Sequence, residues 1–144
     1  MELPDHIYAQ VEILAEQGNE MLDDEDYEGA LASWSEALEL LPEPRNDWDA
    51  AMWLHASMAE AHYQLRDFES ARDAMYDALN APGGNENPYV HYMLGKALLR
   101  LDDEKAVDAL LRAYMLDGED IFDSDEEEGP DALRLLQERG LADE

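Results

Sequence analysis

Apolar residues recur along the chain at the spacing of α-helices, and the same order of positions appears more than once. One apolar stripe spans Val11 to Leu22, a second spans Ala30 to Leu41, and the acidic turn LDDED lies between them. Residues spaced by three and four lie on one face of a helix, so each stripe predicts an amphipathic helix. The pattern therefore predicts two helices joined by a tight turn.

Two further units repeat this plan. The stretch DYEGALASWSEALELLP, which starts at Asp26, returns as DFESARDAMYDALNAPG, which starts at Asp67. The second unit predicts helices over 53–65 and 70–80, and the third predicts a hairpin that ends at Gly118. Proline and glycine interrupt the helical pattern between the units, and a last helical pattern, PDALRLLQERGL, follows Gly129. We therefore expect an all-α chain.

The residues that recur between the units resemble the signature of the tetratricopeptide repeat (TPR), a helix-turn-helix unit of about 34 residues. The matching positions are mostly small or aromatic: Gly18, Ala30, Trp34, Ala37 and Pro42 in the first unit, Ala59, Ala71, Met75 and Ala78 in the second, and Gly95, Ala106, Leu110 and Ala113 in the third. Within this family, the chain resembles the small acidic bacterial proteins.

The resemblance implies a single domain, a right-handed superhelical stack of about three TPR-like hairpins with a C-terminal capping helix. We expect repeats at about 11–42, 52–83 and 88–118, an acidic linker at 119–129 and the capping helix at 130–140. Each hairpin must bury its apolar stripe against a neighbour, and small residues such as Gly18 and Gly95 allow close crossing. The longer first interval places extra residues at EPRNDWDAA, between the first and second units.

The charge of the chain is strongly negative. Nine Lys+Arg stand against 37 Asp+Glu, which gives a formal net charge of -28. Such a field repels nucleic-acid phosphates and anionic lipids and attracts basic proteins. We expect a basic protein partner, no nucleic acid and no membrane. A halophilic or generally acidic proteome would explain the same charge without selecting a partner.

Residues with catalytic or metal-binding chemistry are few. The chain has no cysteine, which excludes disulfides and thiolate chemistry. His55, His62 and His91 occupy places where the repeat packs bulky residues, which favours packing over a metal site. The run DSDEEE at 123–128 lacks the glycine and the closing glutamate of a calcium loop, which favours a solvated acidic linker. We expect no catalytic, metal or cofactor site.

The chain also lacks any run of about 18 apolar residues, and its first residues, MELPDHIYAQVEIL, have no basic region. We therefore expect a cytoplasmic protein, and we favour a monomer.

Two sets of residues are candidates for partner binding. Ligands of the TPR family usually lie in a concave groove lined by the first helix of each repeat, and the resemblance places seven candidates there: Asn19, Trp53, Glu60, Tyr63, Tyr89, Tyr92 and Lys96. Packing inside the fold is an open alternative for Trp53, Tyr89 and Tyr92, and it is the favoured one for Tyr63. The second set consists of acidic residues that would steer a basic partner: Asp23, Asp24, Glu25, Asp26, Asp102, Asp103, Asp125 and Glu126. Ordinary polar turns explain this second set equally well.

The sequence thus predicts a non-catalytic protein–protein interaction module. Small acidic TPR-like proteins resemble products found beside bacterial toxin genes, which implies an immunity protein whose partner is a toxin domain. The alternatives are a general scaffold or assembly factor with several partners, and a phosphate-mimicking inhibitor of nucleic-acid enzymes. One subclass of the family grips the carboxylate of chaperone tails, and Asn19 matches it. Ala15, Tyr89 and Met93 replace its cationic residues, so we do not expect that function.

Overall fold

The computed structural model describes residues 3–143, which form eight α-helices, one short 3-10 helix and no strand. The elements are α1 (Asp5–Asp23), α2 (Tyr27–Leu40), the 3-10 helix (Arg45–Asp47), α3 (Asp49–Gln64), α4 (Phe68–Asn80), α5 (Pro88–Arg100), α6 (Lys105–Asp117), α7 (Asp120–Asp123) and α8 (Gly129–Glu138). The structure confirms the predicted all-α stack of three helical hairpins followed by a C-terminal helix.

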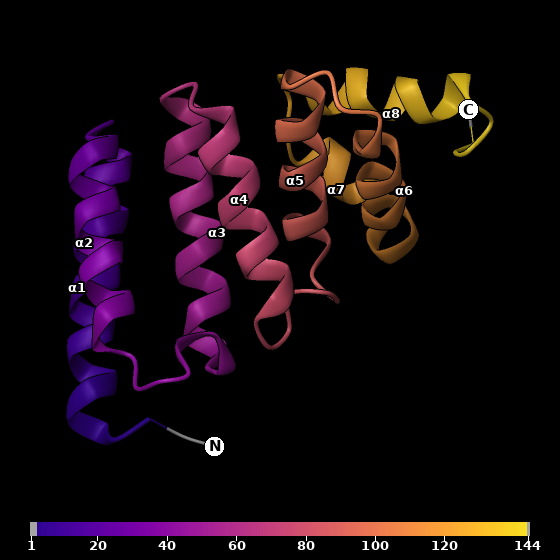
Figure 1. The fold of residues 1–144 in the computed structure, drawn as a ribbon. Helices are drawn as coiled ribbons and strands as arrows, with labels where there is room; N and C mark the ends of the chain where they lie inside the picture. The colour runs from indigo at the N-terminus through magenta and orange to yellow at the C-terminus, as the bar shows by residue number, and fades with distance from the viewer. Residues whose placement is uncertain (1–2, 144) are drawn as a thin grey trace.

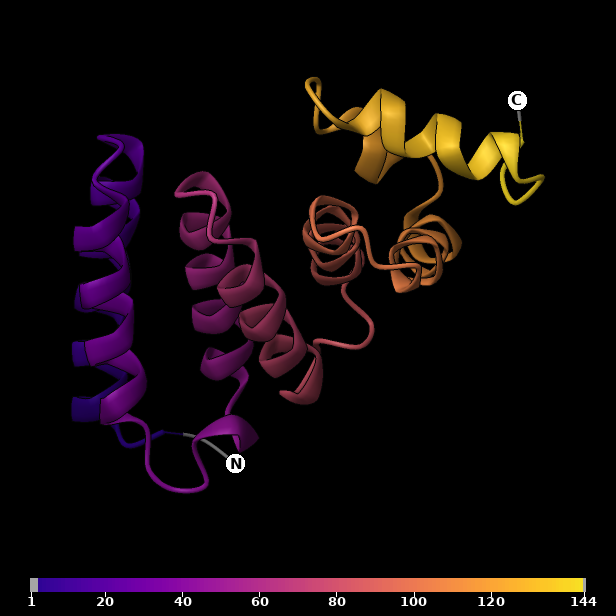
Figure 2. The same ribbon diagram turned by 45° about the horizontal axis from the view of Figure 1, so that its top comes forward.

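The hairpins stack in the order of the chain. Helix α1 packs on α2, α2 on α3, α3 on α4, α4 on α5 and α5 on α6. The three turns inside the hairpins lie along one edge of the stack, at the top of Figure 1. Figure 2 shows α8 lying across α5 and α6, which are seen nearly end-on. The C-terminal helix therefore does not continue the stack as a further parallel layer.

The turns inside the hairpins share one local geometry. Glu25, Arg66 and Asp102 occupy equivalent places and have positive φ angles of 63°, 63° and 56°. A left-handed residue commonly ends a helix, because it turns the chain and lets the last carbonyls be satisfied. The carboxylates of Asp26 and Asp67 then accept hydrogen bonds from the backbone N–H of Gly29 (3.0 Å) and Ser70 (3.2 Å) and cap the next helix.

Small residues lie where the helices approach most closely. Ala30, Ala59 and Ala71 are almost completely buried. Gly18 faces the indole of Trp34, and a Cβ atom added to Gly95 would lie 2.6 Å from Leu110 Cδ2. Both glycines therefore allow a helix of one hairpin to contact a bulky side chain of its partner helix.

The connection between the first two hairpins is shorter than EPRNDWDAA suggests. Helix α3 begins at Asp49, four residues before the expected start at Trp53. Ala51 and Met52 are buried, so extending the helix through them gains apolar burial as well as backbone hydrogen bonds. The indole N–H of Trp48 donates to the carbonyl of Pro42 at 2.8 Å and holds the connection against the stack.

The segment 119–129 differs from the solvated linker that its charge predicts. It contains α7, and the side chains of Ile121 and Phe122 are buried there. Phe122 packs edge-on against Tyr92, with ring centroids 5.3 Å apart. These two apolar residues gain enough burial to hold the acidic residues around them against the fold.

Candidate protein-interaction site

Helices α1, α3 and α5 are the first helices of the three hairpins, and we call the surface they form the first-helix face. Its two halves differ. The half between α3 and α5 is covered by the chain's own segment from α7 to α8, whereas the half between α1 and α3 holds an open cavity. The two halves also differ in charge.

Lys96 is the centre of the covered half. Its residue is only 8% exposed, and its Nζ lies 2.7 Å from Asp125 Oδ2 and 3.5 Å from Glu128 Oε1. The hydroxyl of Tyr92 donates to the same oxygen of Asp125 at 2.7 Å. The lysine also lies over the rings of Tyr63 and Tyr92, at 4.8 Å and 5.3 Å from their centroids, where it gains cation–π attraction.

Glu128 makes a second set of contacts beside Lys96. Its Oε2 accepts hydrogen bonds from the hydroxyl of Tyr63 and from Arg100 Nη2, the latter at 3.3 Å. Arg100 also donates from Nε to the Tyr63 hydroxyl at 3.1 Å. The segment before α8 is thus fixed to both α3 and α5 by charge-assisted hydrogen bonds.

These contacts shift the pKa values of the groups involved. Burial by itself would raise the pKa of Asp125, but the hydrogen bonds from Lys96 and Tyr92 outweigh it and hold that pKa below its usual value. Burial, followed by hydrogen bonds to Asp125 and Glu128, raises the pKa values of Tyr92 and Tyr63. The tyrosines therefore stay protonated and donate, while Asp125 stays charged and accepts.

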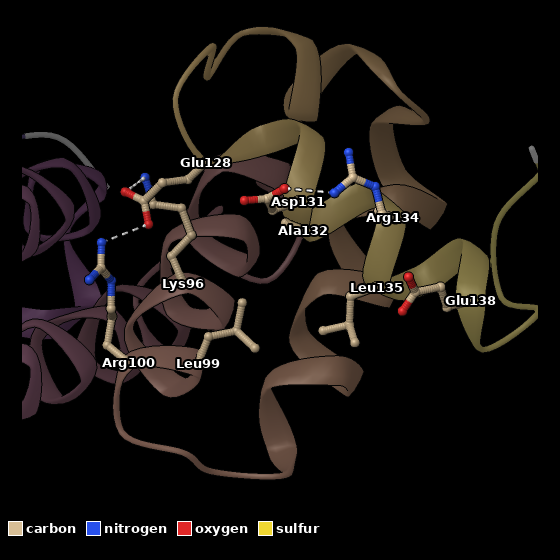
Figure 3. A pocket seen from close by; sticks show the side chains of 9 residues that line it. All are labelled: Lys96, Leu99, Arg100, Glu128, Asp131, Ala132, Arg134, Leu135 and Glu138. Carbon is tan, nitrogen blue, oxygen red and sulfur yellow. Dashed lines mark hydrogen bonds and ion pairs between the residues drawn. The ribbon is translucent and has the colours of Figure 1, made fainter.

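A cleft of about 550 Å³ remains between α5 and α8, and Figure 3 shows Leu99 and Leu135 on its two sides. Its three cations are already paired with acids of the same chain: Lys96 with Asp125, Arg100 with Glu128, and Arg134 with Asp131. This half of the face therefore has little charge left to select a partner.

The open half is a cavity of about 570 Å³ between α1 and α3, which we call the α1–α3 cavity. Its apolar lining consists of Leu3, Val11, Ala15, Trp48, Ala50 and Leu54. Two aromatic side chains line it from opposite helices, and both are largely exposed: Tyr8 of α1 by 53% and Trp53 of α3 by 58%. Exposed aromatic rings beside an apolar hollow are typical anchors of protein–protein binding.

The charges around the α1–α3 cavity have one sign. Its charged lining residues are Asp5, Glu12 and Asp49, and no Lys or Arg of the described residues 3–143 lines it. A hydrogen bond with Glu12, then the charge of Glu12, raises the pKa of Tyr8. Because no cation of the lining offsets them, the three carboxylates give the cavity a negative potential.

The seven groove candidates that the sequence predicts differ in their exposure in the structure. Trp53 and Asn19 are exposed, whereas Tyr63, Tyr92 and Lys96 are buried against the segment from α7 to α8. The hydroxyl of Tyr89 donates to Glu60 Oε2 at 3.1 Å, and both residues are partly buried. Partner contacts by Tyr63, Tyr92 and Lys96 would require that segment to leave, because it occupies the place of a partner.

The acidic candidates also divide. Asp23, Asp24, Glu25, Asp102 and Glu126 are exposed, in keeping with an electrostatic role. Asp26 caps α2, and Asp103 Oδ1 accepts a hydrogen bond from the backbone N–H of Lys105 at 2.9 Å, so both side chains stabilise their turns. Asp125 belongs to the interior network around Lys96.

Sequence reasoning missed Tyr8, Asp5 and Asp49 as cavity residues. The repeat signature begins at about residue 11, whereas α1 begins at Asp5, so its first turns fell outside the repeat. Asp49 was assigned to the connection, but it opens α3. Tyr8 precedes the buried Val11 by three positions, and this helical spacing was the available signal.

Other chemistry is limited in the part of the chain that the structure describes. Over residues 3–143 there is no group of three His, Asp or Glu side chains placed to hold a metal ion. A ring nitrogen of His91 lies 2.8 Å from the carbonyl of Asn85, and burial lowers the pKa values of His55 and His62. None of the helices in this range is both long and apolar enough to cross a membrane.

Comparison with known proteins identifies the fold. No protein-family model matches the sequence. The first TPR domain of Spaghetti (RPAP3), in a structure with the HSP90 peptide SRMEEVD, superposes with a TM-score of 0.70 at 19% sequence identity, over 91% of this chain and 95% of that one. The TPR domain of Arabidopsis OM64 gives a TM-score of 0.73 at 18% identity, over 92% of this chain and 98% of that one. The recurring small residues, the three stacked hairpins and these likenesses agree that the chain has the fold of a TPR domain.

Proposed function

We propose that this protein is a non-catalytic protein–protein interaction module that binds a basic protein partner through its first-helix face. One observation carries the proposal: the α1–α3 cavity is open, holds the exposed rings of Tyr8 and Trp53, and has carboxylates but no Lys or Arg among the described residues that line it. Exposed aromatic rings supply binding energy, and uncompensated acid supplies selection for positive charge.

The comparison with RPAP3 supports a peptide-binding use of this fold and a different choice of charge. The peptide in that structure, SRMEEVD, carries three acidic residues and one arginine. The α1–α3 cavity here carries three carboxylates, so an acidic tail would be repelled from it. A first-helix face lined by carboxylates fits a basic segment instead.

The most specific form of the proposal is an immunity protein that neutralises a bacterial toxin with a basic surface. The formal net charge of -28 supports it, because such a field speeds association with a basic partner. A general scaffold would use the same face for several partners of lower affinity. The number of partners therefore separates the two forms.

Capture of the tagged full-length protein from its native cells tests the proposal. We expect one dominant basic partner at physiological salt and weaker capture at several-fold higher salt, because salt screens the attraction. The double variant Tyr8→Ala with Trp53→Ala should lose the partner. Tyr76→Ala is the matched control, because Tyr76 is also exposed but lies on α4, a second helix.

The result decides between the forms. A single partner that is toxic alone and harmless with this protein supports immunity, whereas several weak partners support a scaffold. A partner without basic character, captured equally at both salt concentrations, would contradict the proposal.

A further inference from the structure

The two halves of the first-helix face differ in whether their charged side chains are paired with opposite charges of the same chain. Where it places cations on the face, at Lys96 and Arg100, it also supplies the acids that meet them, Asp125 and Glu128. At the α1–α3 cavity it places Asp5, Glu12 and Asp49, and none of residues 3–143 contributes a Lys or Arg to the lining. A basic segment of another molecule would supply the positive charge that the described lining of this half lacks.

The aromatic rings narrow the chemistry of that molecule further. Tyr8 and Trp53 keep more than half of their surface exposed, and the lining between them includes the buried Val11 and Leu54. An aromatic or aliphatic side chain of the ligand would gain apolar burial there. An adjacent Arg or Lys of the ligand would form an ion pair with a carboxylate and a cation–π contact with a ring. A purely cationic ligand would leave the apolar lining unused.

The size of the cavity sets the scale of the occupant. About 570 Å³ accommodates a few side chains of a chain segment, in the range of ordinary ligand pockets, and does not accommodate a folded surface. We infer that the α1–α3 cavity is a recognition site for a short segment of a basic protein in which an aromatic residue is flanked by Arg or Lys. This inference deepens the proposed function and rests on it for the source of the segment.

Intrinsic fluorescence gives a direct test with the full-length protein. Trp34 and Trp48 are buried, whereas Trp53 is exposed, so Trp53 should give the larger emission shift when the cavity is filled. Trp48 also lines the cavity, and the variant Trp53→Phe separates its signal from that of Trp53. The probe is a short synthetic peptide with one Phe flanked by Arg. We expect its binding to shift the emission of Trp53 to shorter wavelength, and Trp53→Phe to abolish this change.

Variants and altered probes test each part of the chemistry. Tyr8→Ala should weaken peptide binding about tenfold or more, because it removes one of the two rings. The pair Glu12→Gln and Asp49→Asn should weaken it several-fold and reduce its salt dependence. The matched control pair Glu36→Gln and Glu39→Gln makes the same charge change on exposed residues of α2, a second helix, and should leave affinity within about twofold.

Replacing Arg by Glu in the peptide, or Phe by Ala, should each remove most of the binding. A polyamine that binds as tightly as the peptide would overturn the inference in favour of a small-cation site. Equal binding of the peptide to wild type and Tyr8→Ala would overturn it as well. Chain association through the cavity, seen as a concentration-dependent dimer that the peptide does not displace, would assign the cavity to a second copy and overturn it.

The test is distinguishable from that of the proposed function. If a basic partner is captured from cells but binds the double variant Tyr8→Ala with Trp53→Ala normally, the partner uses another surface. The inference then fails, and of the proposed function the basic partner stands while the α1–α3 cavity as its binding surface does not. If the peptide binds as expected and no basic partner is captured, the cavity chemistry stands and the proposed function fails.

Discussion

Lys96 of α5 and Asp125, which lies just beyond α7, form an ion pair of 2.7 Å between Nζ and Oδ2, and both side chains are mostly buried. They are separated by 29 positions in the chain. The pair joins the last hairpin to the C-terminal segment, and that segment covers the half of the first-helix face between α3 and α5. The pair therefore stabilises the fold and also keeps a partner from binding to the covered half of the face.

Removing the lysine should destabilise the fold. We expect Lys96→Met to lower the free energy of unfolding by about 2 kcal/mol, because Asp125 and Glu128 would keep their charge in a partly buried place without their cation. Urea denaturation measures this. Arg134→Met is the matched control. The side chains of Arg134 and its partner Asp131 are 63% and 80% exposed, so this variant should lower the free energy of unfolding by less than about 0.5 kcal/mol. Equal effects of the two variants would contradict the buried role of Lys96.

The same pair predicts a dependence of stability on pH. The pKa of Asp125 lies below its ordinary value of 3.8 in the folded protein. A carboxylate of this kind stabilises the fold above its unfolded pKa, and the contribution is lost as pH falls through the folded pKa. Asp125→Asn should therefore cost most at neutral pH, and the difference from wild type should shrink below about pH 4.

Urea midpoints of wild type and Asp125→Asn, measured at neutral pH and at about pH 3, give this difference. Comparing the two proteins at each pH cancels the titration of the many other carboxylates. A difference that grows on acidification would show that the pKa of Asp125 is raised by folding.

The contrast between the repeats and the Lys96 network shows what sequence reasoning could reach. The hairpins follow from local spacing: Gly18, Ala30 and Trp34 carry the repeat signature and lie in the predicted close contacts. The pairing of Lys96 with Asp125 depends on where the chain goes after α6, and no local pattern encodes that path. Charge alone therefore assigned the segment 119–129 to solvent.

Candidate site residues show the same division. Trp53 lies on an exposed face of α3, and its role in binding stays a prediction. Tyr92 also lies on a first helix, α5, but it is 2% exposed because Phe122 and Asp125 cover it. Helical position predicted which face each ring points to, and tertiary packing decided whether that face stayed open.

Close packing at Gly18 gives a prediction about the core. Gly18→Ala should lower the free energy of unfolding by about 1–3 kcal/mol, because the new methyl group would overlap the indole of Trp34. That indole also donates from Nε1 to the carbonyl of Ala15 at 3.3 Å, which restricts its movement. Asn19→Ala is the control at the next, exposed position and should change stability by no more than about 0.5 kcal/mol. Denaturation midpoints that fail to separate the two variants would contradict the close contact.

The left-handed turns give a prediction of the opposite sign. Glu25 has a φ of 63°, which strains a residue that carries a Cβ atom. Glu25→Gly should relieve this strain and raise the free energy of unfolding by up to about 1 kcal/mol. Glu36→Gly makes the same change at an exposed position inside α2 and should lower it by about 1 kcal/mol. Thermal denaturation of both variants measures the two signs, and destabilisation by Glu25→Gly would refute the first.

The acidic turn of the first hairpin gives a prediction about binding kinetics. Asp23 lies eight residues beyond Ala15 on α1, or about 12 Å along the helix axis, whereas the Debye length is about 8 Å at physiological salt. Asp23→Asn with Asp24→Asn should therefore slow association of the arginine-flanked peptide several-fold at low salt and by less than about twofold at physiological salt. The dissociation rate should not change, because neither residue lines the cavity. Asp26 stays intact in this variant, since it caps α2.

Stopped-flow fluorescence of Trp53 measures both rates. Glu12→Gln is the comparison within the cavity, and it should slow association more than the turn variant at physiological salt. A faster dissociation from the turn variant would place Asp23 or Asp24 in contact with the peptide and contradict a purely electrostatic role.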